Sequence, residues 1–136
     1  MIRGMTESDM PAVKALMQSI PGFWHEAWND GTLSRALASA GDLALVYEEG
    51  GRIVGMVFCH DLGFRAYLSE LAVAEDMRGM GIARKLLARV EKILRERGCD
   101  MIIADVWHSA ESFYRELGWT QPDVALLRKS LKNPPV

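Results

Sequence analysis

The sequence predicts an α/β (α+β) fold, in which short strands and amphipathic helices alternate along one chain of 136 residues. Two observations carry this prediction. The stretch from Leu71 to Leu87 passes from an apolar strand through a glycine turn into a helix, whose apolar residues recur at positions 82, 86, 87, 90, 93 and 94. Two nearly continuous apolar runs, Leu43 to Glu48 and Arg52 to His60, flank Glu49-Gly50-Gly51, which indicates a β-hairpin buried on both faces.

The other elements follow from spacing and from turn residues. Residues 1–136 form one domain in this interpretation. We expect strands over Ile2 to Met5, Ala66 to Val73, Asp100 to Val106 and Trp119 to Leu131. We expect helices from a Ser8 or Asp9 cap to Pro21-Gly22, over about Thr32 to Ala40, from Ile82 to the stop at Gly98, and from a Ser109 cap to Gly118.

Composition limits the function. Apolar residues make up 49% of the chain, too many for disorder, and a net charge of −2 argues against nucleic acid as a partner. The apolar runs are too short to span a bilayer and no signal-peptide region is evident, so we expect a cytoplasmic protein without a membrane partner. Cys59 and Cys99 are expected to be buried thiols on strands. The scattered His25, His60 and His108 predict no metal site.

The turn after Val73 has the chemistry of an anion site. The first N–H groups of a helix lack partners, and the helix dipole adds positive potential there. Gly79 and Gly81 carry no Cβ, so a phosphate can approach the backbone. Arg78 and Arg84 add positive charge at the same helix end. The alternative is a solvated basic helix end that binds nothing.

Two motifs favour the anion site. Arg78-x-x-Gly81-x-Ala83, after a strand that ends in Leu-Ala-Val, resembles the acetyl-CoA signature of the GCN5-related N-acetyltransferases (GNAT family). About thirty residues later, Ala110-x-x-Phe113-Tyr114-x-x-x-Gly118-Trp119 resembles a second motif of that family. The resemblance covers nearly the whole chain, and Asp123 to Leu131 is similar to the last strand of small bacterial members.

The resemblance implies a mixed sheet of six to seven strands flanked by four helices and splayed between the fourth and fifth strands. It also implies acetyl-CoA as co-substrate and no metal. The pantetheine arm would pair with backbone groups of the fourth strand, as an added strand does. The cofactor-binding residues implied are Leu71, Ala72, Val73, Arg78, Gly79, Met80, Gly81, Ile82, Ala83, Arg84, Trp107 and Tyr114. Trp107 departs from the family, which often has Asn there.

The resemblance places Tyr114 as the general acid that protonates the CoA thiolate. A phenol suits this role because it is protonated at neutral pH and its pKa is near that of a thiol. Glu70 is the tentative base, although strand alternation places it on the face opposite Leu71. A β-bulge, common in this strand of the family, would reverse that orientation. Glu26, His60, His108 and a relaying water are rival bases, and packing is the expected role of Cys59.

Residues 23–30 combine aromatic and acidic side chains in a connector between two helices. One interpretation is a hydrophobic plug over the sheet. The other is a substrate wall, because this region borders the acceptor site in the family. Trp24, Glu26 and Trp28 are then the substrate-binding residues, and Glu26 with Asp30 would hold a cationic amine while an aromatic ring stacks on it.

We therefore expect an acetyl-CoA-dependent N-acetyltransferase, in which a primary amine attacks the thioester directly in a ternary complex. The acceptor is a small-molecule amine or a peptide N-terminus, and a homodimer is compatible with the sequence. The alternative function is a non-catalytic acyl-CoA-binding or sensing domain on the same fold, because fold alone does not separate the two.

Overall fold

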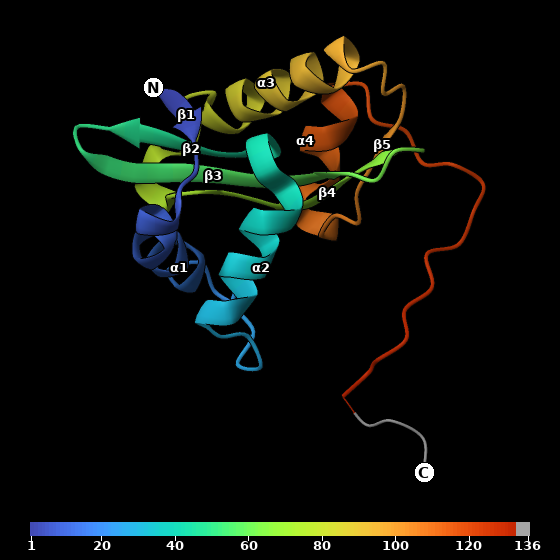
Figure 1. Ribbon diagram of the computed structural model, residues 1–136. Coiled ribbons are helices and arrows are strands. Elements are labelled where there is room, and N and C mark those ends of the chain that lie inside the picture. The colour runs from blue at the N-terminus through green and yellow to red at the C-terminus, as the bar shows by residue number, and fades with distance from the viewer. Residues whose placement is uncertain (133–136) are drawn as a thin grey trace. The chain divides into compact units, whose positions relative to one another are not determined.

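The computed structural model describes residues 1–132, and the chain divides into two compact units, Met1–Ala104 and Asp105–Val136. The first unit contains a five-stranded sheet in the order β1-β2-β3-β4-β5 (Figure 1). Its strands are β1 (Ile2–Gly4), β2 (Ala44–Glu49), β3 (Arg52–Asp61), β4 (Ala66–Val73) and β5 (Ile102–Ile103). The organisation of residues 1–136 as one domain stays a prediction.

The sheet is mixed, as expected. The pairs from β1 to β4 are antiparallel, whereas β4 and β5 are parallel. The prediction of six to seven strands was wrong, because five are present among the described residues. The strand expected over Asp100 to Val106 shortens to two residues, since it pairs with β4 only at Ala66 and Tyr67.

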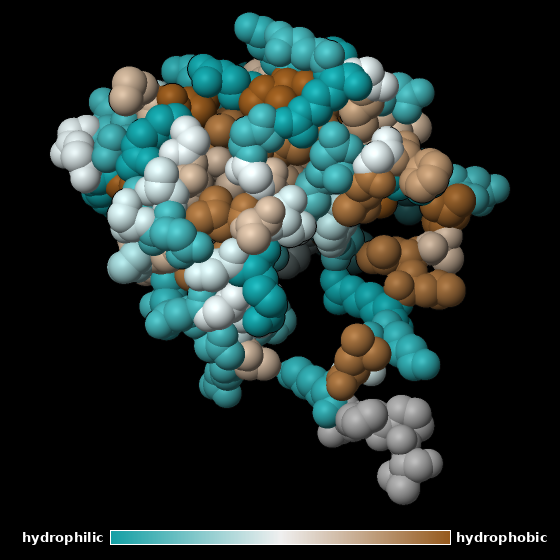
Figure 2. All heavy atoms as spheres, viewed as in Figure 1, coloured by the Kyte–Doolittle hydropathy of each residue, from teal (hydrophilic) through white to brown (hydrophobic). Residues whose placement is uncertain are grey.

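The terminal strand expected over Trp119 to Leu131 does not form in the described part of the chain. Pro122 has no N–H to donate to a ladder, and the adjacent Leu126 and Leu127 break the alternation that a half-buried strand needs. These two residues are 68% and 87% exposed, and Figure 2 shows apolar atoms at the surface of this segment. An apolar run becomes a strand only where it finds a partner strand, which its sequence alone does not guarantee.

Residues 1–132 form four α-helices: α1 (Met10–Gln18), α2 (Asp30–Ala40) and α3 (Ile82–Glu96) in the first unit, and α4 (Glu111–Glu116) in the second. Helix α3 covers one face of the sheet and α1 and α2 cover the other (Figure 1). Gly55 of β3 allows α3 to lie close, because a Cβ there would stand 2.8 Å from Ile82 Cγ2 and 3.3 Å from Leu86 Cδ1. The sheet is therefore enclosed on both sides within the first unit.

The core confirms the expectation that the hairpin strands are buried on both faces. Residues 54–59 of β3 and 44–46 of β2 are all buried. Val13, Leu16 and Met17 of α1 close one side, and Leu86, Leu87 and Val90 of α3 close the other. The helix prediction over residues 82–94 is also confirmed, since these α3 residues belong to the predicted apolar face.

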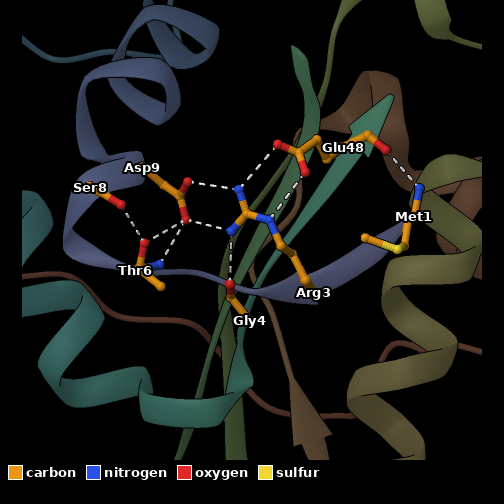
Figure 3. A network of polar contacts seen from close by, with 7 residues as sticks. All are labelled: Met1, Arg3, Gly4, Thr6, Ser8, Asp9 and Glu48. Atoms are coloured by element: carbon orange, nitrogen blue, oxygen red, sulfur yellow. Dashed lines mark hydrogen bonds and ion pairs between the residues drawn. The ribbon is translucent and has the colours of Figure 1, made fainter. Parts of the chain in front are cut away.

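An arginine at the N-terminus ties three elements of this unit together (Figure 3). Arg3 of β1 donates two hydrogen bonds to the Asp9 carboxylate, at 2.8 and 2.9 Å, and two longer ones to the Glu48 carboxylate of β2, at 3.3 and 3.4 Å. Asp9 is buried and also accepts from the Thr6 N–H at 2.8 Å. These charged hydrogen bonds, above all those from Arg3, lower the pKa of Asp9 to about 2.

Two smaller expectations have different outcomes. Cys59 is buried on β3, as predicted, and burial raises the pKa of its thiol to about 11. Cys99 is only half-buried and lies just before β5 rather than on a strand, so that prediction was wrong.

Within residues 1–132, no helix has the length and apolar character to cross a membrane.

Candidate active site

The turn between β4 and α3 is built as the sequence predicts. After Val73 the chain makes a short 3₁₀ turn over Glu75–Met77, and Arg78 is then extended. Gly79 and Gly81 both adopt left-handed conformations, with φ of 80° and 77°. Such angles favour glycine, because any Cβ would clash with the following carbonyl oxygen. Two glycines, one on each side of Met80, therefore shape the entry into α3.

The N-terminus of α3 presents unpartnered donors. Gly81 is the N-cap residue and has no side chain to bond the first turn, and the first helical hydrogen bond runs from Lys85 N–H to Gly81 O at 3.0 Å. The N–H groups of Ile82, Ala83 and Arg84 thus precede any intrahelical acceptor. The first turn of α3 also contains no acidic residue, which leaves its positive dipole end uncompensated.

Positive side chains surround these donors. Arg78, Arg84 and Lys85 are exposed, and no carboxylate in the described chain forms an ion pair with them. Lys85 lies over the Tyr47 ring, with Nζ 6.0 Å from its centroid. A bound polyanion would turn this unfavourable charge arrangement into a favourable one.

The turn also has room for such a ligand. A Cβ built on Gly79 or Gly81 would meet no other atom within 4 Å, so the space beside both residues is open. The donors, the charges and the open space together fit the pyrophosphate of a nucleotide cofactor. The residues predicted from Arg78 to Arg84 lie consecutively on this turn, and the structure brings them together as the sequence indicated.

The edge of β4 continues the site. Leu71, Ala72 and Val73 pair with β3 through Val57, Met56 and Gly55. On the opposite edge, among the described residues, the parallel ladder joins only Ala66 to Ile102 and Tyr67 to Ile103. The β4 backbone from Leu68 to Val73 therefore has no β5 residue in register beside it. An extended ligand has access to strand-type hydrogen bonding there.

A β-bulge lies in β4, the strand in which the resemblance to the family allowed one. Phe58 pairs with Glu70 but Cys59 pairs with Leu68, so Ser69 is the extra residue. The extra residue comes before Glu70, so the normal alternation holds from Glu70 to Val73: Glu70 pairs with Phe58, whereas Leu71 and Val73 share the opposite face with Gly55, against which α3 packs. The bulge therefore does not turn Glu70 to the face of Leu71, and the anticipated reversal does not occur. Glu70 is half-buried and lies on the face covered by α1 and α2.

A histidine next to this bulge links two elements on that face. His60 Nδ1 is 2.8 Å from the Ser39 hydroxyl of α2, and Nε2 is 2.8 Å from the Ser69 hydroxyl. Ser69 donates to Phe58 O at 3.4 Å, so its oxygen accepts from Nε2–H and Nδ1 accepts from Ser39. Burial lowers the pKa of His60, which is therefore neutral at pH 7. No sequence pattern points to the two serines, because they contact His60 only through tertiary structure.

The predicted substrate-binding aromatics meet each other in the connector between α1 and α2. The Trp24 and Trp28 rings pack edge to face, with centroids 5.4 Å apart, and His25 lies 4.6 Å from Trp28. Both indoles are half-buried, while Glu26 is exposed. Lys14 of α1 lies over Trp24, with Nζ 5.4 Å from the ring centroid.

The second unit contains Tyr114 and Trp107. Tyr114, on α4, packs edge to face against Phe113 and Trp119, with both pairs of centroids 5.3 Å apart. Burial raises the pKa of Tyr114 to about 12, and no hydrogen bond to its hydroxyl is formed by any residue that the structure describes. Trp107 is 53% exposed and is the residue just before the 3₁₀ turn His108–Ala110. His108 is exposed and forms a long contact of 3.9 Å with Glu111.

Comparisons with known proteins settle the family. The sequence profile of the acetyltransferase (GNAT) family matches residues 13–119. The chain belongs to this family. It is 38% identical over 109 residues to an acetyltransferase of Pectobacterium atrosepticum, covering 76% of this chain and 77% of that protein. The family predicted from the two motifs is thereby confirmed, and with it the expectation of an N-acetyltransferase.

Solved structures confirm the GNAT fold. The PaiA N-acetyltransferase of Thermoplasma acidophilum in complex with coenzyme A has a TM-score of 0.79 and 17% identity, over 92% of each chain. A transcriptional regulator of Bacillus halodurans has a TM-score of 0.78 and 21% identity, over 96% of this chain and 99% of that one. At such identities the likeness establishes the fold alone, which an N-acetyltransferase and a transcriptional regulator share. Within residues 1–132, no three or more His, Cys, Asp or Glu side chains are grouped so that they could hold a metal ion.

Proposed function

We propose that this GNAT protein transfers the acetyl group of acetyl-CoA to a primary amine, by direct attack of the amine on the thioester. The observation that carries the proposal is the turn from Arg78 to Arg84, where uncapped N–H groups and two left-handed glycines lie beside two arginines that have no ion pair with any described residue. The acetyltransferase relative that covers three quarters of the chain supports the transfer reaction itself.

The residues assigned to acetyl-CoA divide by the part of the molecule that they would hold. The turn from Arg78 to Arg84 would bind the pyrophosphate through backbone N–H groups and guanidinium charge. The β4 backbone at Leu71, Ala72 and Val73 would pair with the amides of the pantetheine arm. Trp107 and Tyr114 would lie along the arm and at the sulfur, as the family motif implies. Acetyl-CoA supplies an activated acetyl group that a neutral amine attacks directly.

Glu70 is the general base in this proposal. Glu70 lies on the face that α1 and α2 cover, and the connector with Trp24 and Trp28 joins these same two helices. His60 fits the role less well, because both its ring nitrogens are already hydrogen-bonded to serines. We assign it to holding Ser69, and thereby the bulge, in place. Glu26 and His108 are exposed, which leaves an amine beside them solvated.

Tyr114 is the group that meets the departing sulfur. Its pKa of about 12 lies well above that of an ordinary thiol, about 8.5, so complete proton transfer to the thiolate is uphill by roughly 5 kcal/mol. The structure therefore separates the two pKa values that the sequence interpretation took to be close. Tyr114 stays protonated at neutral pH, and its hydroxyl, which has no hydrogen-bond partner among the described residues, can donate a hydrogen bond as negative charge develops on sulfur.

Two-substrate kinetics test direct attack. An acceptor is first found by following CoA thiol release with a panel of primary amines, with tertiary amines as the unreactive control. Initial rates are then measured at several concentrations of both substrates. Direct attack predicts intersecting double-reciprocal lines, whereas parallel lines indicate an acetylated enzyme. Acetyl-CoA binding without release on any amine would favour the acyl-CoA-sensing function instead.

A further inference from the structure

The connector of the first unit already holds an alkylammonium group, and it belongs to the chain itself. Lys14 Nζ lies 5.4 Å from the centroid of the Trp24 ring and 3.1 Å from Asp30 Oδ1. Lys14 comes from α1, Trp24 from the connector and Asp30 from the first residue of α2. Three separate segments thus converge on one ammonium.

Trp24 and Asp30 each supply one interaction that stabilises such a cation. The indole face attracts an ammonium through its quadrupole, and the carboxylate supplies the opposite charge. The Trp24 ring is braced by Trp28, which packs against it nearly at a right angle, at 89°. Asn29 fixes the start of α2 through its side-chain hydrogen bond from Thr32 N–H at 3.2 Å, which places Asp30. The site is therefore built by the fold and does not depend on Lys14 alone.

The chemistry of the site decides which amino group of a substrate it would take. A carboxylate and an indole face both stabilise the charged form of an amine, whereas attack on a thioester requires the neutral form. A group held here is kept protonated and is a poor nucleophile. The site therefore suits a second amino group that anchors the substrate while a different one reacts.

We propose that Trp24 and Asp30 form an ammonium subsite for a diamine or polyamine acceptor, and that Lys14 is an internal competitor which the acceptor displaces. This inference rests on the proposed amine acetylation and names its substrate class. Displacement is inexpensive, because the Asp30 side chain is 91% exposed and that of Lys14 is 33% exposed. A ligand that must displace the Lys14–Asp30 ion pair and the Lys14–Trp24 contact binds with an affinity about fivefold lower than it would without them.

The test compares two probes that differ by one ammonium: diaminobutane, with an amino group at each end, and butylamine. Lys14→Met keeps the apolar stem and removes the competing charge. It should lower KM for diaminobutane about fivefold and leave KM for butylamine unchanged. Asp30→Asn should raise KM for diaminobutane alone. Lys92→Met, which removes an exposed charge from α3, is the matched control and should change neither value.

A binding measurement separates this proposal from the proposed function. Without acetyl-CoA, diaminobutane should quench the tryptophan fluorescence of the Lys14→Met protein, and the quench should vanish in Lys14→Met/Trp24→Phe. Binding without acetylation of any amine would leave the subsite standing and overturn the transfer reaction. Acetylation in which Lys14→Met changes KM equally for both probes, or for neither, would overturn the subsite. Absence of binding to Lys14→Met would overturn it as well.

Discussion

Replacing Gly81 by alanine tests whether the turn from Arg78 to Arg84 binds the cofactor, and it does so without disturbing the packing. Gly81 has a φ of 77°, and a Cβ on it would meet no atom within 4 Å, so the substitution introduces strain but no clash. A non-glycine residue in the left-handed region costs about 1–2 kcal/mol. For a chain of this size we expect the melting temperature to fall by roughly 4–8 °C.

Gly98 is the matched control, because it lies at the other end of the same helix with a φ of 82° and equally open surroundings. Gly98→Ala should lose the same stability as Gly81→Ala. The two variants should differ with CoA present. At a hundred times its Kd, CoA stabilises a protein by about 2.7 kcal/mol, and a tenfold weaker affinity reduces this to about 1.4 kcal/mol.

The assay is thermal unfolding with and without CoA, at one CoA concentration for all variants. Wild type and Gly98→Ala should show the full shift, and Gly81→Ala about half of it or less, because the added Cβ stands where the pyrophosphate approaches the backbone. An equal shift in Gly81→Ala and Gly98→Ala would refute the reasoning and move the cofactor away from this turn.

Three further predictions address the acid, the packing and the N-terminal charge network. Tyr114→Phe should lower kcat by about ten- to a thousandfold at unchanged CoA affinity and unchanged melting temperature, because its hydroxyl has no partner in the described chain; equal turnover would make it a packing residue. Gly55→Ala should cost about 1–3 kcal/mol in urea unfolding, since its Cβ would stand 2.8 Å from an α3 side chain, whereas Gly4→Ala, with nothing within 4 Å, should be nearly neutral. The carboxylate of Asp9 has its pKa lowered to about 2, so its contribution of roughly 2 kcal/mol is fully present above about pH 4 and is lost as the pH falls toward 2. Asp9→Asn should therefore lose that stability at pH 7 and show a flatter decline between pH 4 and 2, and identical acid unfolding of the two proteins would contradict this assignment.

The part of the fold that could be predicted is the part that short-range chemistry determines. The α3 helix could be predicted from the spacing of its apolar residues. The turn before it could be predicted from Gly79 and Gly81, because glycine readily adopts the left-handed conformation that both residues have. The prediction of a terminal strand over Trp119 to Leu131 was wrong, because a strand depends on long-range pairing. A strand is stabilised by a partner elsewhere in the chain, and an apolar run does not reveal whether that partner is present.

In the candidate site, too, features within one stretch of chain could be predicted, whereas features that depend on tertiary contacts could not. The turn from Arg78 to Arg84 is a continuous stretch, so its conformation could be predicted, whereas the bulge at Ser69 was anticipated only as a property of the family. The contacts of His60 with Ser39 and Ser69 span 21 and 9 residues, and no spacing rule connects them. The raised pKa of Tyr114 also depends on burial, which the motif around it does not report.

The most direct measurement follows an isotopically labelled acetyl group from acetyl-CoA, with mass spectrometry of both the amine and the intact protein. Our account predicts that the label appears on the amine in step with CoA release, and that the protein incubated with acetyl-CoA alone carries no label. Labelled protein in the absence of an amine would contradict direct attack. Tight CoA binding without labelled product on any primary amine, diaminobutane included, would contradict the assignment as an N-acetyltransferase.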